Sequence, residues 1–484
     1  MTSPPPHHRR WSTASHRFRR TVTRLAGRFD EALGAPAGSP PAVEEEQEVP
    51  GELLTLLCRV GVALIGAGET SATVQNTLND LAARYGAHTV HFMVLPTAVF
   101  VRVRTTAGSS VDMLDAEVGT LPLDQIAGLY RLLDRIQDEV PPPAEADREL
   151  TALLSAKPGS PPWLILLGQV VLTVGLGMML NPAAQALVGY VVLGLVVGVL
   201  TQIGDRVRLL SYALPVVAAA AVAALSFGFP EALSGGNPTQ LLVPAVATLL
   251  PGTMLTNGTI ELANGSMVAG ASRIVYGINM LFLLSFGLYV GISVLGDLPP
   301  AQPESSQLGW WAPLIGVLLI GIGHSWRSSA PKNSLGWLLV VLWATFAAQA
   351  FGKFVSGPLT GAFLGGLVAV PAAYLIRNRS NAPPPQVAFL PAFWMLVPGG
   401  ISLQGVSELV LHTTRDVGVS GLEVMVSALL SVMSIALGVM VGSGLIRTSY
   451  PHMTTLMGTA HPSARVESWL ARHGNPRPSP DPDS

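Results

Sequence analysis

The sequence predicts a mainly α-helical, polytopic membrane protein, with about ten transmembrane helices in two inverted five-helix repeats preceded by a small cytosolic α/β domain. Three observations predict this fold class. Only 12% of the 484 residues are charged and 49% are hydrophobic, whereas soluble domains average about 25% charged residues. Apolar runs long enough to cross a bilayer begin at Trp163. A 19-residue segment of the first half also recurs in the second half.

Composition divides the chain into five parts. We predict a disordered basic arm over 1–50, a cytosolic α/β domain over 51–157, a first transmembrane repeat over 158–298, a second over 299–450, and a disordered cytosolic tail over 451–484. The arm holds seven arginines within residues 9–28 and much Pro and Ser, which is typical of disorder, although such an arm can also contact anionic lipid headgroups. Because no apolar signal core precedes Gly51, we expect the N-terminus to stay in the cytosol.

The predicted cytosolic domain combines helices with a hairpin. We expect helices over 53–65, from Thr70 or Ser71 to Gly86, and from Pro122 to Pro141, with strands over 88–95 and 98–105. Threonine and serine are preferred helix N-caps, and glycine commonly ends a helix. In the second strand, the valines at 99, 101 and 103 recur at every other position, as in a strand with one buried face.

Ten apolar segments follow this domain. We place spans over 163–181, 183–203, 209–229, 240–260, 274–296, 309–324, 334–352, 354–376, 387–411 and 421–446. With a cytosolic N-terminus, eight Lys or Arg fall in cytoplasmic loops and only two on the opposite side, which supports the count and places both termini in the cytosol. Glycines spaced by four at 194/198, at 357/361/365 and at 438/442 predict close helix contacts.

An internal duplication gives the most information about function. Residues 244–262, PAVATLLPGTMLTNGTIEL, align without gaps with residues 391–409, PAFWMLVPGGISLQGVSEL, and match at eight of 19 positions. The copies lie in the fourth and ninth predicted spans, and an odd difference in span number reverses the direction of crossing. We therefore predict inverted repeats, a plan common in secondary transporters, in which paired Pro/Gly-interrupted spans indicate the substrate site.

The predicted substrate site lies at two Pro–Gly pairs. At a rise of about 1.5 Å per residue, both pairs fall about 17 Å into their spans, close to the middle of a ~30 Å hydrocarbon core. Proline lacks an amide donor and glycine accepts unusual backbone angles, so a helix broken there exposes backbone groups to a solute. The candidate residues are Pro251, Gly252, Thr253, Thr256, Asn257, Pro398, Gly399, Gly400, Ser402, Gln404 and Ser407.

We expect a substrate carboxylate at the half-helix N-termini, where the helix dipole favours negative charge. The alternative is that each Pro–Gly pair merely kinks a packed helix whose hydroxyl groups satisfy their own backbone.

Three charged residues belong to the same prediction. Glu261 and Glu408 lie about 32 Å along their spans, near opposite membrane faces, where they suit gate residues or proton carriers. Ordinary interfacial carboxylates lie at the same depth, so both interpretations stay open. Arg273 begins the fifth span, where positive-inside anchoring is the simpler explanation and a role in transport is the alternative.

Several classes of function lack support in the sequence. It contains no GxxxxGK[ST] phosphate loop, no HExxH zinc helix and no GxSxG nucleophile elbow, so we expect no enzyme, cofactor or metal site. Cys58 is the only cysteine, which excludes a disulfide or CxxC pair within one chain. The net charge of −2 argues against a nucleic-acid partner.

The residues resemble those of a known family. Pro251–Gly252–x–x–Leu255–x–Asn257, followed by Gly265, Gly270 and Arg273, looks like the signature of bacterial threonine/serine exporters. The stretches GAGETSATVQNTLNDLAARYG at 66–86 and VLPTAVFVRV at 94–103 are similar to the cytoplasmic domain of that family, and Leu396–Val397–Pro398–Gly399–Gly400 resembles its C-terminal part. The resemblance covers about residues 50–450, with both parts of a sometimes split arrangement in one chain. Glu261 departs from the Asp expected in relatives.

The resemblance implies a secondary active transporter that exports L-threonine and L-serine, driven by the proton gradient. We therefore expect an amino acid as substrate, the proton as coupling ion, and a multi-pass protein of a bacterial cytoplasmic membrane that can form homo-oligomers. One alternative is an exporter of dicarboxylates such as succinate, but residues 240–262 and 387–411 contain no Lys or Arg. An alternative of another class is a membrane-anchored sensor whose domain 51–157 reads a cytosolic ligand.

Overall fold

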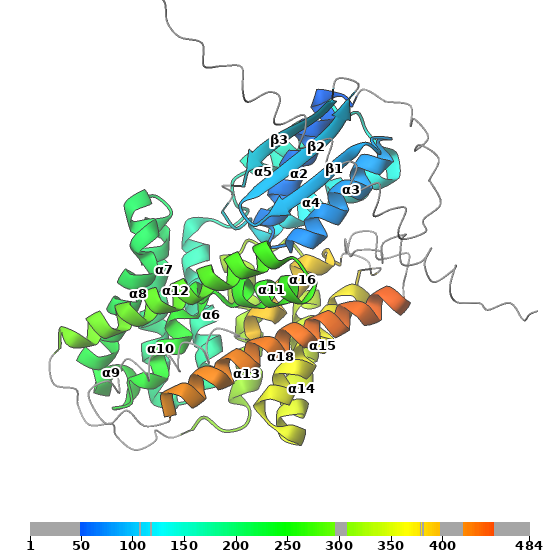
Figure 1. The fold of residues 1–484 in the computed structure, drawn as a ribbon. Coiled ribbons are helices and arrows are strands. Elements are labelled where there is room, and N and C mark those ends of the chain that lie inside the picture. The colour runs from blue at the N-terminus through cyan, green and yellow to red at the C-terminus, as the bar shows by residue number, and fades with distance from the viewer. Residues whose placement is uncertain are drawn as a thin grey trace, which may run out of the picture. The chain divides into compact units, whose positions relative to one another are not determined.

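The computed structural model describes residues 49–105, 108–116, 119–295, 307–377, 379, 382–396 and 420–449. The N-terminal part contains four helices and three strands: α2 (Gly51–Gly66), α3 (Ser71–Arg84), β1 (Val90–Leu95), β2 (Ala98–Thr105), β3 (Gly108–Asp115), α4 (Leu123–Glu139) and α5 (Pro143–Ser155). Figure 1 shows these elements in blue and cyan. We call residues 49–157 the N-terminal domain.

The sheet has the order β1-β2-β3 and includes the predicted hairpin. β1 and β2 are antiparallel, with Phe92 opposite Val101, and the alternate valines of β2 are buried as expected. The third strand was not predicted, because its side chains give no buried periodicity: Val111 is 64% exposed and Met113 is 51% exposed.

The helices of this domain follow from their caps and apolar faces. Thr70 caps α3 by accepting a hydrogen bond from the amide of Thr73 at 3.3 Å, as predicted. The apolar residues of α2 and α3 are buried together with Val99 and Val101. At the other end of the domain we expected Pro141–Pro143 only to end a helix, but Pro143 also begins α5, because proline suits the first turn of a helix.

The rest of the described chain is helical. It contains α6 (Pro162–Leu180), η1 (Ala184–Ala186), α7 (Leu187–Gly204), α8 (Arg208–Gly228), α9 (Pro230–Ser234), α10 (Thr239–Val246), η2 (Ala247–Leu249), α11 (Gly252–Ala263), α12 (Met267–Ser293), α13 (Ala312–Arg327), α14 (Leu335–Ser356), α15 (Pro358–Leu375), α16 (Pro385–Met395) and α18 (Ser420–Ser449). Seven helices of the described residues are long and apolar enough to cross a membrane, or eight if one bent pair counts as a span.

The protein is therefore a multi-pass membrane protein, and a larger number of spans stays a prediction. Each of the ten predicted spans overlaps a described helix, but α13 has only 16 residues and α16 only 11. The remainder of the predicted ninth span, from 397 to 411, lies outside the described residues. The inverted relation of the two halves is likewise a prediction.

Small residues allow the membrane helices to approach closely. Gly442 of α18 packs on α15, as its spacing predicts, since a Cβ there would lie 2.5 Å from the carbonyl oxygen of Leu367. The packing of α6 on α13 was not predicted. A Cβ on Gly316 would lie 2.8 Å from the carbonyl oxygen of Gly175. Glycines on these two helices stand seven apart, at 168/175 and 316/323, rather than four apart.

The N-terminal domain packs directly on helices of the second half. Its buried core continues into Leu338 of α14 and Val387 of α16. An ion pair joins Asp134 of α4 to Arg377, with 3.1 Å between carboxylate oxygen and guanidinium nitrogen. The amide of Leu123 also donates to the carbonyl of Ser328 at 2.8 Å. Apolar contacts and polar contacts thus both fix the domain to residues 328–390.

Candidate functional site

A broken helix lies where the sequence predicts one. Residues Thr239–Leu249 and Gly252–Ala263 form two helical pieces that are bent by 63° at their junction. Leu250 is extended, Pro251 stands at the N-cap of α11, and Gly252 begins the helix. Proline at this position cannot donate to the preceding turn, so the helical hydrogen bonds stop here.

The second predicted break cannot be compared with the structure. Its residues all lie outside the described part of the chain: Pro398, Gly399, Gly400, Ser402, Gln404, Ser407 and Glu408. α16 ends at Met395, three residues before the proline.

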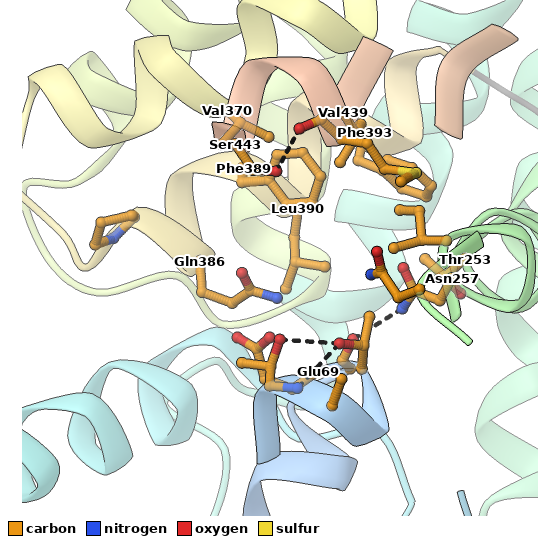
Figure 2. A pocket seen from close by; sticks show the side chains of 18 of the residues that line it. Glu69, Thr253, Asn257, Val370, Gln386, Phe389, Leu390, Phe393, Val439 and Ser443 are labelled. Atoms are coloured by element: carbon orange, nitrogen blue, oxygen red, sulfur yellow. Dashed lines mark hydrogen bonds between the residues drawn. The ribbon is translucent and has the colours of Figure 1, made fainter. Parts of the chain in front are cut away.

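A cavity of about 380 Å³ adjoins the first break. Its walls come from α11, α15, α16 and α18, and from the segment Gly68–Thr73 of the N-terminal domain (Figure 2). The polar lining residues are Glu69, Thr70, Thr73, Thr253, Asn257, Asn264, Tyr374, Gln386 and Ser443. The apolar wall includes Val370, Phe389, Leu390, Phe393, Val439 and Met440. A cavity of mixed polarity and this size suits a small organic molecule.

One face of α11 lines the cavity. Thr253, Asn257, Ile260 and Asn264 follow one another at intervals of four, three and four residues, which is the repeat of a helix face. Two of them, Thr253 and Asn257, were predicted as site residues. Thr256 points elsewhere: it is fully buried, and its hydroxyl makes no hydrogen bond with a described residue.

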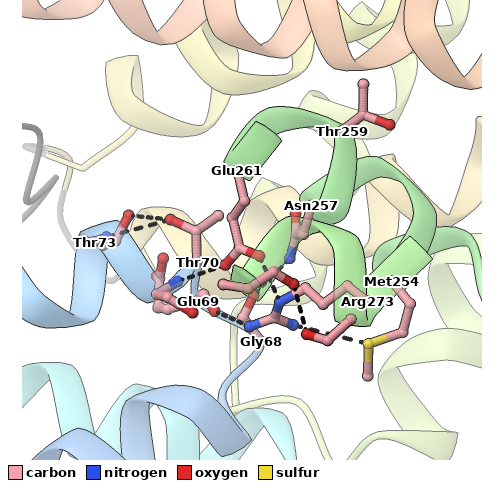
Figure 3. A network of polar contacts seen from close by, with 12 residues as sticks. Gly68, Glu69, Thr70, Thr73, Met254, Asn257, Thr259, Glu261 and Arg273 are labelled. Atoms are coloured by element: carbon pink, nitrogen blue, oxygen red, sulfur yellow. Dashed lines mark hydrogen bonds and ion pairs between the residues drawn. The ribbon is translucent and has the colours of Figure 1, made fainter. Parts of the chain in front are cut away.

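The segment Gly68–Ser71 of the N-terminal domain binds α11 and α12. The Asn257 side-chain amide donates to the carbonyl of Gly68 at 3.0 Å, and the amide of Ser71 donates to Oε1 of Glu261 at 2.7 Å. Arg273 donates from Nη2 to the carbonyl of Glu69 at 3.2 Å (Figure 3). Three predicted site residues therefore hold one loop of the N-terminal domain, a relation that sequence periodicity could not show.

Glu261 and Arg273 form a buried ion pair. Nε of Arg273 lies 3.1 Å from Oε2 of Glu261, and the two side chains are 5% and 0% exposed. This burial excludes the interpretation that Arg273 only anchors the chain at lipid headgroups. The pair fixes Glu261 next to the loop of the N-terminal domain, since charges buried in this way require a partner.

Two glycines make this pairing geometrically feasible. α11 turns into α12 at Gly265, whose φ of +83° suits glycine. A Cβ on Gly270 would lie 2.7 Å from the carbonyl oxygen of Gly258, so the two helices touch backbone to backbone. The turn at Gly265 and the close contact of Gly258 with Gly270 thus place the carboxylate and the guanidinium side by side.

Glu69 is the site residue that the sequence analysis missed. It lines the cavity and accepts a hydrogen bond from the Tyr130 hydroxyl of α4. Desolvation raises the pKa of the Glu69 carboxyl, and the Tyr130 hydrogen bond and the Arg273 charge only partly oppose that effect. Burial and the Glu69 charge raise the pKa of Tyr130 well above its ordinary value, so this hydroxyl keeps its proton. Nothing in the sequence separates Glu69 from an ordinary acidic residue before a helix.

A second buried polar cluster lies on the other side of the break. Thr248 of η2 accepts a hydrogen bond from Nε2 of Gln169 at 3.3 Å, and Oε1 of that glutamine accepts from Nε of Arg327 at 2.7 Å. Arg327 is the last residue of α13, and Gln169 lies on α6. The cluster ties the break to α6 and α13.

The fold and this site define a class of protein: a multi-pass membrane protein with a broken helix and a small polar cavity that membrane helices share with an N-terminal domain. The residues 55–295 match the family described as "Putative threonine/serine exporter". Over these residues, about half of the chain, the protein is similar to the threonine/serine exporter family.

Individual relatives are distant. A "Probable threonine/serine exporter" of Mycobacterium tuberculosis is 23% identical over 416 residues, which cover 81% of this chain and 76% of the relative. An uncharacterized protein of Schizosaccharomyces pombe is 23% identical over 389 residues, covering 76% of this chain and 45% of that protein.

"Pheromone-regulated membrane protein 10" of Candida albicans is 25% identical over 319 residues, which cover 61% of this chain and 28% of that protein. The chain therefore spans less than half the length of these fungal relatives. No solved structure matches the chain.

Proposed function

We propose that this protein is a secondary active transporter that exports small polar amino acids of the threonine and serine type. The observation that carries the proposal is the cavity of about 380 Å³ beside the Pro251–Gly252 break, with polar side chains on one wall and apolar side chains on the other. A zwitterion with a short side chain needs both kinds of contact. Similarity to the exporter family supports the same substrate class.

Each predicted residue of α11 receives a proposed role. Thr253 and Asn257 offer a hydroxyl and an amide to the substrate, and the first turn of α11 offers amide groups that lack a helical acceptor. A carboxylate is stabilised near such amides. Glu261 and Arg273 act as a gate, because they hold the loop that covers one wall of the cavity.

Coupling to the proton gradient is part of the proposal. Glu261 and Glu408 were both predicted as gate residues or proton carriers, and the buried ion pair of Glu261 favours the gate role for that residue. We propose location in a bacterial cytoplasmic membrane with both termini in the cytosol, which the distribution of Lys and Arg between loops supports.

The two alternative functions receive less support. A dicarboxylate would require cationic groups, and the described residues that line the cavity include the carboxylate of Glu69 but no Lys or Arg. A sensor that only anchors the N-terminal domain would need no cavity shared with four membrane helices. The amino-acid exporter uses both the cavity and the break.

Counterflow in proteoliposomes tests the proposal. The purified full-length chain should exchange labelled threonine and serine but not succinate. Thr253→Ala and Asn257→Ala, and Gln404→Ala in the second repeat copy, should lower the exchange at least tenfold.

Thr259→Ala is the matched control for these variants. This threonine belongs to α11 but donates its hydroxyl to the carbonyl of Leu255 at 2.8 Å and does not line the cavity. Normal exchange in Thr253→Ala and Asn257→Ala together would refute the site, and exchange of succinate alone would refute the substrate class.

A further inference from the structure

One carboxylate faces the cavity, and the N-terminal domain supplies it. Of the described residues that line the cavity, Glu69 is the only one with an acidic or basic side chain other than the phenol of Tyr374. The membrane helices contribute hydroxyl, amide and apolar groups to the same space. The charge of this cavity therefore depends on a residue outside the membrane spans.

The neighbouring guanidinium does not neutralise Glu69. Arg273 pairs its Nε with Glu261, directs Nη1 to the sulfur of Met254 at 3.8 Å, and donates from Nη2 to the main-chain carbonyl of Glu69. No ion pair within 4.0 Å involves the Glu69 carboxylate among the described residues. Arg273 thus binds Glu261 and the main chain of the loop directly, and it acts on the Glu69 carboxylate only through its charge, without a direct ion pair.

A hydrogen bond within the N-terminal domain holds the Glu69 side chain in place. The Tyr130 hydroxyl of α4 donates to Oε1, so only one of the two carboxylate oxygens takes part in that bond. Figure 2 shows Glu69 among the residues that line the cavity. Glu69 is partly buried in the wall of the cavity, and no ion pair within 4.0 Å compensates its carboxylate among the described residues, so a cation in the cavity would stabilise it. The geometry provides the space for such a cation inside the cavity.

We propose that the Glu69 carboxylate binds the ammonium group of the transported molecule, so that the N-terminal domain selects the substrate. This inference rests on the proposed function and deepens it. It assigns to the site a preference for small polar molecules that carry a primary ammonium group over hydroxy acids that lack one. Tyr130 is then a positioning residue, because it acts through Glu69.

The first experiment compares two substrates in proteoliposomes. Threonine and 3-hydroxybutyrate differ chiefly in the ammonium group. In Glu69→Gln we expect the KM for threonine to rise at least tenfold while exchange of 3-hydroxybutyrate stays equal or increases. Glu52→Gln, an exposed residue in the first turn of α2, serves as the matched control and should leave both values unchanged.

Two further variants separate binding from folding and from proton transfer. Glu69→Asp keeps the charge and should restore part of the threonine affinity, and Tyr130→Phe should raise the KM for threonine less than Glu69→Gln does. A Glu69→Gln protein with a wild-type KM for threonine would overturn the proposal. This holds even if the pH dependence of transport changes, because Glu69 would then act in proton transfer and not in binding the ammonium group.

A binding measurement keeps this inference distinct from the proposed function. Ethanolamine carries an ammonium group but no carboxylate, and it should raise the melting temperature of the detergent-purified full chain but not that of Glu69→Gln. If the wild type exchanged neither threonine nor serine but showed this shift, the exporter proposal would fail and the ammonium site would stand. Equal shifts in both proteins, or none in the wild type, would overturn the ammonium site.

Discussion

Glu69 links the chemistry of the cavity to the pH dependence of stability. Because its pKa is raised by desolvation, the folded chain binds this proton more tightly than the unfolded chain does. The contribution of Glu69 to stability is therefore fully present below its ordinary pKa of 4.5 and is lost as the pH rises through the raised value. The charged and titratable groups around it are Tyr130 on α4, Arg273 on α12 and Tyr374 on α15.

We expect Glu69→Gln to have a higher melting temperature than the wild type at neutral pH. The difference should shrink as the pH falls towards 4.5, because the wild-type carboxyl then becomes neutral too. Thermal denaturation of the purified protein across this pH range measures it. A difference that did not depend on pH would show that desolvation of Glu69 is not its cause.

The buried pair Glu261–Arg273 yields a second prediction for single residues. Glu261→Gln leaves the Arg273 charge buried without its partner and should destabilise the protein by about 3–5 kcal/mol. The double variant Glu261→Gln/Arg273→Met should recover most of that loss, because both charges are then removed. Denaturation of the wild type, the two single variants and the double variant would measure these free energies of unfolding. An equal loss of stability in Glu261→Gln and in the double variant would contradict the prediction.

At the scale of residues, the sequence predicted which side chains of α11 are polar but not which of them meet the cavity. Helical periodicity separates Thr253 and Asn257 from Thr256, yet it cannot say which face points to the neighbouring elements. Glu69 escaped prediction because its importance comes from Tyr130, which is 61 residues away in sequence. Contacts of this kind arise only when the fold is formed.

At the scale of elements, the packing of α11 on α12 leaves no room for an added methyl group. In Gly270→Ala the new Cβ would lie 2.7 Å from the carbonyl oxygen of Gly258, and overpacking of this kind costs about 1–3 kcal/mol. We expect the variant to unfold at lower temperature and to lose transport, because Arg273 moves away from Glu261.

Gly336→Ala on α14 is the control for this prediction. An added Cβ there meets nothing within 4 Å, so the better helix propensity of alanine should leave stability unchanged or raise it by up to about 1 kcal/mol. Circular dichroism melting curves compare the two variants. Equal stability of Gly270→Ala and the wild type would mean that the helices do not touch as described.

At the scale of elements, local rules predicted the features that depend on local sequence. The break at Pro251, the N-cap at Thr70 and the β1–β2 hairpin follow from the preferences of proline, threonine and alternating valines. The strand β3 escaped because its apolar side chains are exposed, so that no alternation marks it. The packing of α6 on α13 was not predicted, because the glycines at its contact are spaced by seven residues and not by four.

For the whole molecule, the inverted arrangement of two halves gives the next prediction. A membrane-impermeant maleimide should label Leu262→Cys and Leu409→Cys from opposite sides of the membrane. The native Cys58 should give no background at neutral pH, because burial and the charge of Asp112 raise the pKa of its thiol to about 11.

The unsubstituted chain is the control for this labelling experiment. Labelling of both introduced cysteines from one side would show that the two copies of the repeat run in the same direction.

The N-terminal domain makes two kinds of contact with the membrane helices. Its apolar core is continuous with Leu338 and Val387, whereas its loop contacts Asn257, Glu261 and Arg273 through hydrogen bonds. Hydrogen bonds can be exchanged for bonds to water, but exposed apolar surface finds no such replacement. If the two halves move against each other during transport, we expect the N-terminal domain to stay with α14 and α16, and its contacts with α11 to break first.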